Sequence, residues 1–172
     1  MVVTGLAPAR DWLFWSCVAA LLVPVWVYPH FPTQDGPAHL ASAVLLNRYC
    51  SPGTRFHEFF NVRPEPLPNW GAQALLTTLC YVFPPLIAEK VFVTGHLILF
   101  ALSFRYLATG VVTGARVNSL LALVFAFNLC VWMGFYSFCL GVDALLFCLG
   151  YVVRRGRLGG GDAAVVGGVL VA

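Results

Sequence analysis

Charged side chains are scarce in this chain: 10% of its 172 residues are Asp, Glu, Lys or Arg, whereas 60% are hydrophobic. An ordinary soluble domain carries roughly 25% charged residues. The composition, with a mean hydropathy of +0.84, therefore indicates an integral membrane protein. The formal net charge of +3 is spread along the chain, and no block of like charges suggests a nucleic-acid-binding arm or an acidic partner. We expect no nucleic acid among its partners.

Familiar catalytic motifs are also missing. The sequence has no phosphate-binding P-loop, no His-Glu-x-x-His and no Gly-x-Ser-x-Gly. Its six cysteines have neither the spacing of a metal site nor the density of a disulfide scaffold. Five of them lie in apolar runs, where we expect them to pack as small hydrophobes, and only Cys50 lies in a polar segment.

The apolar stretches divide into segments of membrane length, since a bilayer core of about 30 Å takes around 20 residues of helix. A stretch such as Val117–Val153 would reach about 55 Å as one helix, so it should form two helices that turn near Gly134-Phe135-Tyr136-Ser137. The predicted spans are Trp12–Val27, Trp70–Ala88, Val91–Leu107, the two within Val117–Val153, and the beginning of another over Ala163–Ala172. The prediction is an all-α, polytopic transmembrane helix bundle. It is a single domain over residues 1–172 with about five complete spans and a truncated sixth, and we expect it to be the N-terminal part of a longer protein.

Two features of the sequence give conflicting predictions for the orientation of these spans in the membrane. A cytoplasmic N-terminus places the first loop outside, but simple crossings then leave the cluster Arg154–Arg157 outside as well, against the positive-inside tendency. Either one apolar segment is half-length, with the stretch before Pro84-Pro85 as the candidate, or the whole protein is inverted. We expect Glu89-Lys90, just after these prolines, to form an ion pair at a membrane boundary.

One polar loop, residues 30–68, interrupts the apolar sequence and is the predicted functional region. It holds six of the chain's seventeen charged side chains (10 Lys and Arg plus 7 Asp and Glu) and three of its four histidines. Asp35-Gly36-Pro37 predicts a helix start, with Asp35 as N-cap and Pro37 in the first turn. The helix should run over about 36–49 and lie along the membrane interface, with Asp35 and His39 on one face.

The charged groups of this loop have two interpretations each. Asp35 is either a general base or ligand, with His39 as its hydrogen-bonding or phosphate-contacting neighbour, or it only caps the helix. Farther along the loop, Arg55, His57 and Arg63 lie among aromatic residues. These side chains suit a phosphate or diphosphate, and they suit lipid headgroups equally well.

Three motifs resemble a known family: Asp35-Gly36-Pro37-Ala38-His39-Leu40, Pro68-Asn69-Trp70 and Ala88-Glu89-Lys90. Together with one span, an external acidic loop and an interfacial helix, they resemble bacterial membrane proteins of the GT-C class of polytopic glycosyltransferases, over residues 12–153. The resemblance implies transfer of a sugar from a polyprenyl-phosphate donor at the external face of the bacterial cytoplasmic membrane. Asp35 matches the position of the catalytic base, and the local candidates for substrate binding are His39, Arg55, His57 and Arg63.

The sequence also departs from the commoner GT-C pattern. Gly36 follows Asp35 where a second acid often stands. We therefore expect no bound metal and no cofactor, and we expect membrane lipids and the lipid-linked donor as partners.

Two other functions stay open. Asp143 lies in the fifth predicted span, and an ionisable side chain at membrane depth suggests a transporter or channel component, unless it only hydrogen-bonds to a neighbouring helix. Gly134, Gly141, Gly150 and the run 159–161 suit a noncatalytic membrane assembly subunit, because small residues allow close helix packing. Glycine is also simply frequent in membrane helices.

Overall fold

The computed structural model describes residues 9–62, 70–112, 118–157 and 159–171. Within these ranges all regular structure is helical, which confirms the predicted all-α class for this part of the chain. The helices are α1 (Ala9–Val27), α2 (Gly36–Arg48), α3 (Phe56–Phe59), α4 (Trp70–Val82), α5 (Pro85–Val111), the short 3-10 helix η1 (Asn118–Leu120), α6 (Leu121–Phe125), α7 (Leu129–Met133), α8 (Tyr136–Arg155) and α9 (Gly160–Val171).

Two helices of the described residues, α5 with 27 residues and α8 with 20, are long and apolar enough to cross a membrane. The segments Trp12–Val27 and Leu121–Met133 are apolar but shorter. Helix α4 has 13 residues, which is about 20 Å of helix. Helix length alone therefore gives fewer spans than the predicted five or six.

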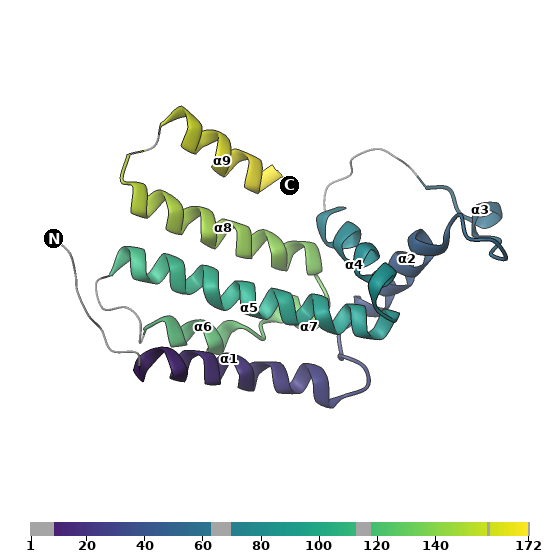
Figure 1. The fold of residues 1–172 in the computed structure, drawn as a ribbon, viewed down its shortest axis with the longest axis horizontal. Coiled ribbons are helices and arrows are strands. Elements are labelled where there is room, and N and C mark those ends of the chain that lie inside the picture. The colour runs from purple at the N-terminus through teal and green to yellow at the C-terminus, as the bar shows by residue number, and fades with distance from the viewer. Residues whose placement is uncertain (1–8, 63–69, 113–117, 158, 172) are drawn as a thin grey trace.

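Helix α5 is the centre of the fold and packs against α8, α1 and α4 (Figure 1). Helix α9 follows beside α8, and α6 lies between α1 and α5. At one end of the molecule α2 packs against α4, and α3 lies beyond them (Figure 1). The polar first loop is thus an extension from one end of the helix stack, next to the beginning of α5.

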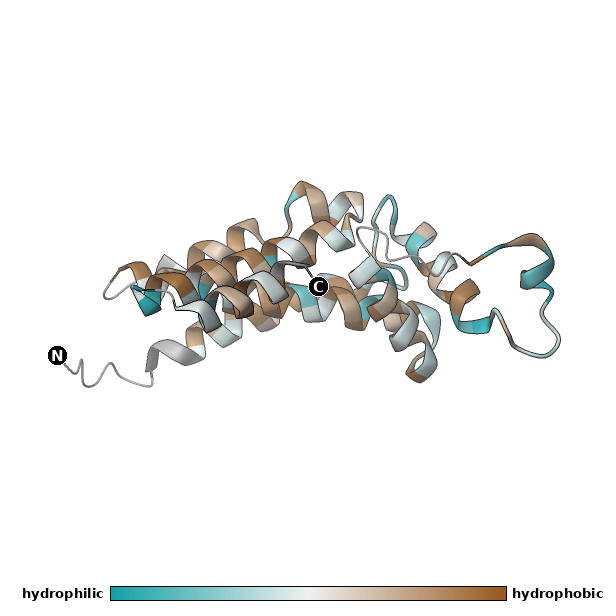
Figure 2. Cartoon of the chain, turned by 90° about the horizontal axis from the view of Figure 1, so that it is seen from above, coloured by the Kyte–Doolittle hydropathy of each residue, from teal (hydrophilic) through white to brown (hydrophobic). Residues whose placement is uncertain are grey.

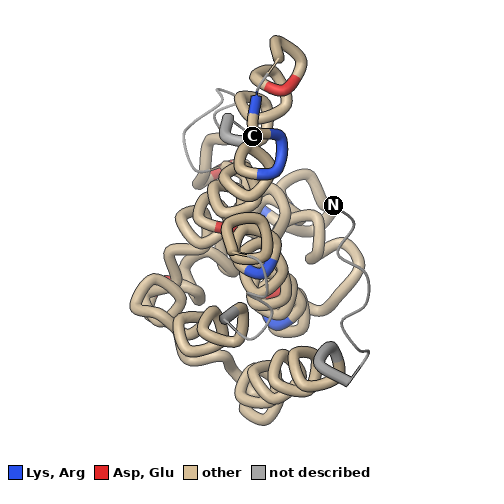
Figure 3. Tube along the Cα trace, turned by 90° about the vertical axis from the view of Figure 1, so that its left-hand side faces the viewer, with Lys and Arg blue, Asp and Glu red and all other residues tan. Residues whose placement is uncertain are grey.

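The core consists of apolar side chains that α5 shares with its neighbours. Its centre includes Val93 and Leu97 of α5, Val25 of α1 and Leu76 of α4, all fully buried. Many other large apolar side chains are exposed. Figure 2 shows that hydrophobic residues run along the helix stack. Charged residues are few along the tube in Figure 3. An apolar surface of this extent marks a membrane or protein contact.

Two adjacent prolines separate α4 from α5. Helix α4 ends at Val82, Pro84 is the N-cap of α5, and Pro85 is the first residue of α5. A proline inside a helix removes a hydrogen bond, but in the first turn its missing N–H costs nothing. The expected boundaries at Ala88 and Val91 were therefore wrong, because Glu89 and Lys90 belong to the beginning of α5.

The predicted turn near Gly134 is confirmed. Gly134 has φ +78°, in the left-handed region that favours glycine, and it ends α7. The segment before it is not the single helix that the sequence predicted. The side chain of Asn128 accepts hydrogen bonds from the backbone N–H groups of Cys130 and Val131, so it caps α7 and separates it from α6.

Candidate functional site

Helix α2 begins at Gly36 and ends at Arg48, close to the predicted 36–49. Asp35 occupies the N-cap position, but its side chain makes no capping hydrogen bond. The side chain is half-buried. Its carboxylate is therefore not engaged in capping the helix, which was the alternative to a chemical role.

The segment before α2 is held against the turn between α7 and α8. The backbone N–H groups of Gln34 and Asp35 donate to the carbonyl oxygens of Trp132 and Met133, at 3.0 and 3.1 Å. The ring of Phe31 stacks on the indole of Trp132, with centroids 5.9 Å apart. Asp35 thus sits on a backbone that is anchored to a part of the chain almost a hundred residues away.

Below this segment lies a buried group of oxygen atoms, which we call the Glu89–Tyr136 cluster (Thr33, Glu89 and Tyr136). The hydroxyl group of Tyr136, at the beginning of α8, donates to Glu89 Oε1 of α5 at 2.7 Å. The Thr33 hydroxyl lies 3.3 Å from the same Tyr136 oxygen. All three side chains are buried, so the cluster joins the first loop, α5 and α8 at a single point.

Gly36 fits directly over this cluster. A Cβ atom at position 36 would lie 2.0 Å from Thr33 Oγ1, 2.4 Å from Glu89 Oε1 and 2.7 Å from the Tyr136 hydroxyl oxygen. The carboxylate of Glu89 is therefore next to the residue that follows Asp35.

Two histidines lie around the same carboxylate. The imidazole of His39 is 5.4 Å from the ring of Tyr136, centroid to centroid, and both His30 and His39 interact electrostatically with Glu89. The structure thus brings Asp35 and His39, two of the predicted site residues, into one region. It adds Glu89, Tyr136 and Thr33, which the sequence analysis had not proposed as site residues.

The expected ion pair between Glu89 and Lys90 was wrong. Consecutive residues on a helix do not face each other, and Lys90 Nζ donates instead to the carbonyl oxygen of Tyr28 at 2.6 Å. The same ammonium group lies 5.6 Å from the ring centroid of Trp26. Lys90 is buried, so it fastens the residue that follows α1 to the beginning of α5.

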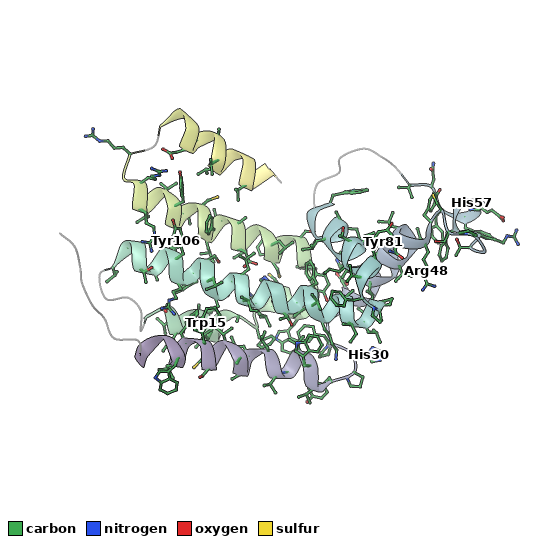
Figure 4. The ribbon with its side chains drawn as sticks, viewed as in Figure 1. Trp15, His30, Arg48, His57, Tyr81 and Tyr106 are labelled. Carbon is green, nitrogen blue, oxygen red and sulfur yellow. The ribbon has the colours of Figure 1, made fainter. Side chains whose placement is uncertain are left out.

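Two other predicted binding residues, Arg55 and His57, lie at the opposite end of α2. Hydrogen bonds from the Thr54 hydroxyl to the carbonyl oxygens of Arg48 and Ser51 hold the following turn at the C-terminal end of α2. His57 accordingly appears at the tip of the extension in Figure 4, far from His30. Arg55 donates to Glu58 at 2.8 Å, a bond that raises the pKa of the Arg55 guanidinium. Arg63 lies outside the described residues.

No family model, no curated protein and no solved structure matches this chain. The functional interpretation therefore rests on the residues and their geometry.

A second polar pair lies deep between α5 and α8. His96 Nδ1 is 2.8 Å from Asp143 Oδ2, and both side chains are buried. Asp143 of α8 thus forms a hydrogen bond with His96 of the neighbouring helix α5. Such a bond was the alternative to a role in transport. His96 Nε2 and Asp143 Oδ1 have no hydrogen-bond partner in the described part of the chain. Nor do the described residues contain a group of three or more His, Cys, Asp or Glu side chains that could hold a metal ion.

Proposed function

We propose that this chain is part of a membrane-embedded glycosyltransferase of the GT-C type, which transfers a sugar from a polyprenyl-phosphate donor at the external membrane face. In this proposal α1, α4 and the α6–α7 segment complete a polytopic bundle around α5 and α8. The observation that supports it most directly is the half-buried carboxylate of Asp35 at the beginning of α2, which makes no capping hydrogen bond.

In the proposed reaction, Asp35 accepts the proton of an acceptor hydroxyl group as the hydroxyl oxygen bonds to the anomeric carbon of the sugar. The bond between that carbon and the phosphate oxygen breaks, and the polyprenyl phosphate leaves with the electron pair. Such a base must be held in a fixed position relative to its substrate. The two backbone hydrogen bonds that anchor Gln34 and Asp35 support this role, because they fix the backbone that carries the Asp35 side chain.

The neighbouring side chains have distinct proposed roles. His39, one turn after Asp35 and next to Tyr136, is the candidate for contact with the departing phosphate. The Glu89–Tyr136 cluster holds the loop on α5 and α8. Since Arg55 and His57 lie at the far end of α2, their position favours contact with lipid headgroups over contact with a phosphate near Asp35.

The test is Asp35→Asn, assayed as sugar transfer in membranes that contain the protein and a polyprenyl-phosphate sugar. The amide cannot accept the proton, so we expect transfer to fall by about 10²-fold or more. The amount of protein in the membrane should stay the same, since the Asp35 side chain makes no capping bond in the native fold.

Glu58→Gln is the matched control, because it also replaces an acid by its amide in the same loop, at the tip of the extension. Transfer should be unchanged in this variant. Full transfer by Asp35→Asn would exclude Asp35 as the base, and equal losses in both variants would indicate an effect of loop charge.

A further inference from the structure

Arginine side chains gather at one end of the helix stack, which we call the arginine end (Arg105, Arg154, Arg155 and Arg157). The guanidinium group of Arg154, in the last turn of α8, donates to the carbonyl oxygen of Tyr106 in α5 at 2.8 Å, so α8 ends beside Arg105. Figure 3 looks onto this end of the molecule, and Figure 4 places Tyr106 at the opposite end of the stack from His30. The arginine end therefore lies away from the first loop.

The distance between the two ends is close to the thickness of a bilayer core. The bond between Tyr136 and Glu89 joins the beginnings of α8 and α5, and Arg154 joins their ends, so the two helices run parallel. About 24 Å of helix separates Glu89 from Arg105, and about 27 Å separates Tyr136 from Arg154. Since the hydrocarbon core is about 30 Å thick, the arginines and the first loop suit opposite headgroup layers.

Helix α1 and the α6–α7 segment run in the other direction. The guanidinium carbon of Arg105 lies 4.4 Å from the ring centroid of Phe14, near the beginning of α1, whereas Tyr28, just after α1, bonds to Lys90 at the beginning of α5. Helix α6 shares an apolar cluster with the beginning of α1, and the backbone of Trp132 in α7 bonds to the first loop. Both segments thus connect the arginine end with the end that carries the first loop.

Helix α4 does not connect the two ends. Gln73 Nε2, near its beginning, donates to the carbonyl oxygen of His39 in α2 at 3.3 Å, and α4 ends just before Pro84 and the beginning of α5. Its 13 residues therefore stay beside the first loop (Figure 1). Without that crossing, the first loop and the cluster Arg154–Arg157 lie on opposite sides, and the positive-inside tendency agrees with an external first loop.

We propose that the arginine end is a docking surface for acidic phospholipid headgroups of the cytoplasmic leaflet. The inference does not depend on glycosyl transfer. Arginine binds phosphate through paired N–H groups, and the cytoplasmic leaflet attracts basic residues next to membrane-spanning helices because it carries acidic lipids. The arginines that follow the span are also exposed, so a headgroup can reach them.

The positive charge of this surface is not neutralised within the described residues. Arg154 donates to two uncharged groups, the Tyr106 carbonyl oxygen and the Thr109 hydroxyl group. Arg155 Nε lies 3.4 Å from Asp162 Oδ1 of α9. In the described part of this end, that carboxylate accompanies four guanidinium groups, so the surface keeps an excess of positive charge that suits an anionic headgroup.

The test is native mass spectrometry of the purified full chain in a nonionic detergent, with phosphatidylglycerol and phosphatidylcholine of the same acyl chains. Phosphatidylglycerol should bind about fivefold more tightly or better, because its headgroup has a net negative charge and that of phosphatidylcholine has none. Arg157→Gln should weaken phosphatidylglycerol binding about fivefold, the factor expected for one basic residue at an acidic surface.

Arg48→Gln is the matched control, because it removes an exposed arginine in the last turn of α2, beside the first loop. It should bind phosphatidylglycerol as the unmodified chain does. Equal affinity for the two lipids, or an equal loss in the two variants, would overturn the proposal.

The side of the membrane is tested with Gly160→Cys in a Cys50→Ser background. A Cβ at Gly160 meets nothing within 4 Å, and the position is exposed beside the arginine end, so this variant offers a thiol there and keeps every arginine. A membrane-impermeant maleimide should label it only after the membrane is permeabilised. Labelling in intact cells would overturn the assignment to the cytoplasmic leaflet.

Discussion

Gly36 is the residue on which the geometry of the candidate site depends most. Its lack of a side chain allows the beginning of α2 to lie against three buried oxygen atoms, one each from the first loop, α5 and α8. The sequence identified this position only as the place where an acid was missing. In the fold, the absence of a side chain leaves room for Glu89 of α5 next to Gly36.

Gly36→Ala should therefore destabilise the protein. The added methyl group would overlap Thr33, Glu89 and Tyr136, and overpacking of this kind costs about 1–3 kcal/mol of the free energy of unfolding. The measurement is denaturation in detergent followed by circular dichroism. Gly95→Ala is the control, because a Cβ at Gly95 in α5 meets nothing within 4 Å. It should be neutral or stabilising by up to about 1 kcal/mol, and similar losses in both variants would contradict the close contact at Gly36.

At the scale of elements, the contact between α5 and α8 defines the fold. The rings of Tyr106 and Phe147 stack with centroids 5.0 Å apart, and Arg154 donates to the carbonyl oxygen of Tyr106. A Cβ on Gly150 would lie 2.5 Å from Tyr106 Cδ1 and 3.1 Å from the Leu107 Cα atom. Gly150 therefore serves packing within this chain, and its presence does not require an assembly partner.

Gly150→Ala should lower the free energy of unfolding by about 1–3 kcal/mol. The added methyl group would meet the backbone of Leu107, which cannot move aside as a flexible side chain can. Gly141→Ala in the same helix has open space at its Cβ and should be neutral or slightly stabilising. Thermal unfolding in detergent measures both. A larger loss at Gly141 than at Gly150 would contradict this account of the α5–α8 contact.

The element boundaries show where sequence patterns succeed. Asp35-Gly36-Pro37 and Gly134 act through their own backbone geometry, so the beginning of α2 and the turn before α8 were predicted closely. The division between α6 and α7 depends on the Asn128 side chain, which competes with the helix for backbone N–H groups. Apolar composition contains no signal for that competition.

At the scale of the whole molecule, the apolar helix stack suits the hydrocarbon of a membrane, whereas the polar extension suits water. Cys50 lies on the extension and is exposed, whereas the other cysteines are half-buried or buried in the helix stack. Because thiol reagents react with accessible thiolates, Cys50 reports the side of the membrane on which the first loop lies.

We expect a membrane-impermeant maleimide to label the protein in intact bacterial cells, since the proposed site faces outward. Cys50→Ser should abolish this labelling, which would assign it to the first loop. Labelling that appears only after the membrane is permeabilised would place the loop in the cytoplasm and contradict an external reaction.

The sequence by itself determined the helical class, the position of the polar loop and the helix that begins after Asp35. Each of these depends on composition or on neighbouring residues. Only the tertiary structure decided that Glu89 lies beside Gly36, that Tyr136 joins them and that His96 pairs with Asp143. These contacts join residues about fifty positions apart or more, and they form because α5 packs against both the first loop and α8.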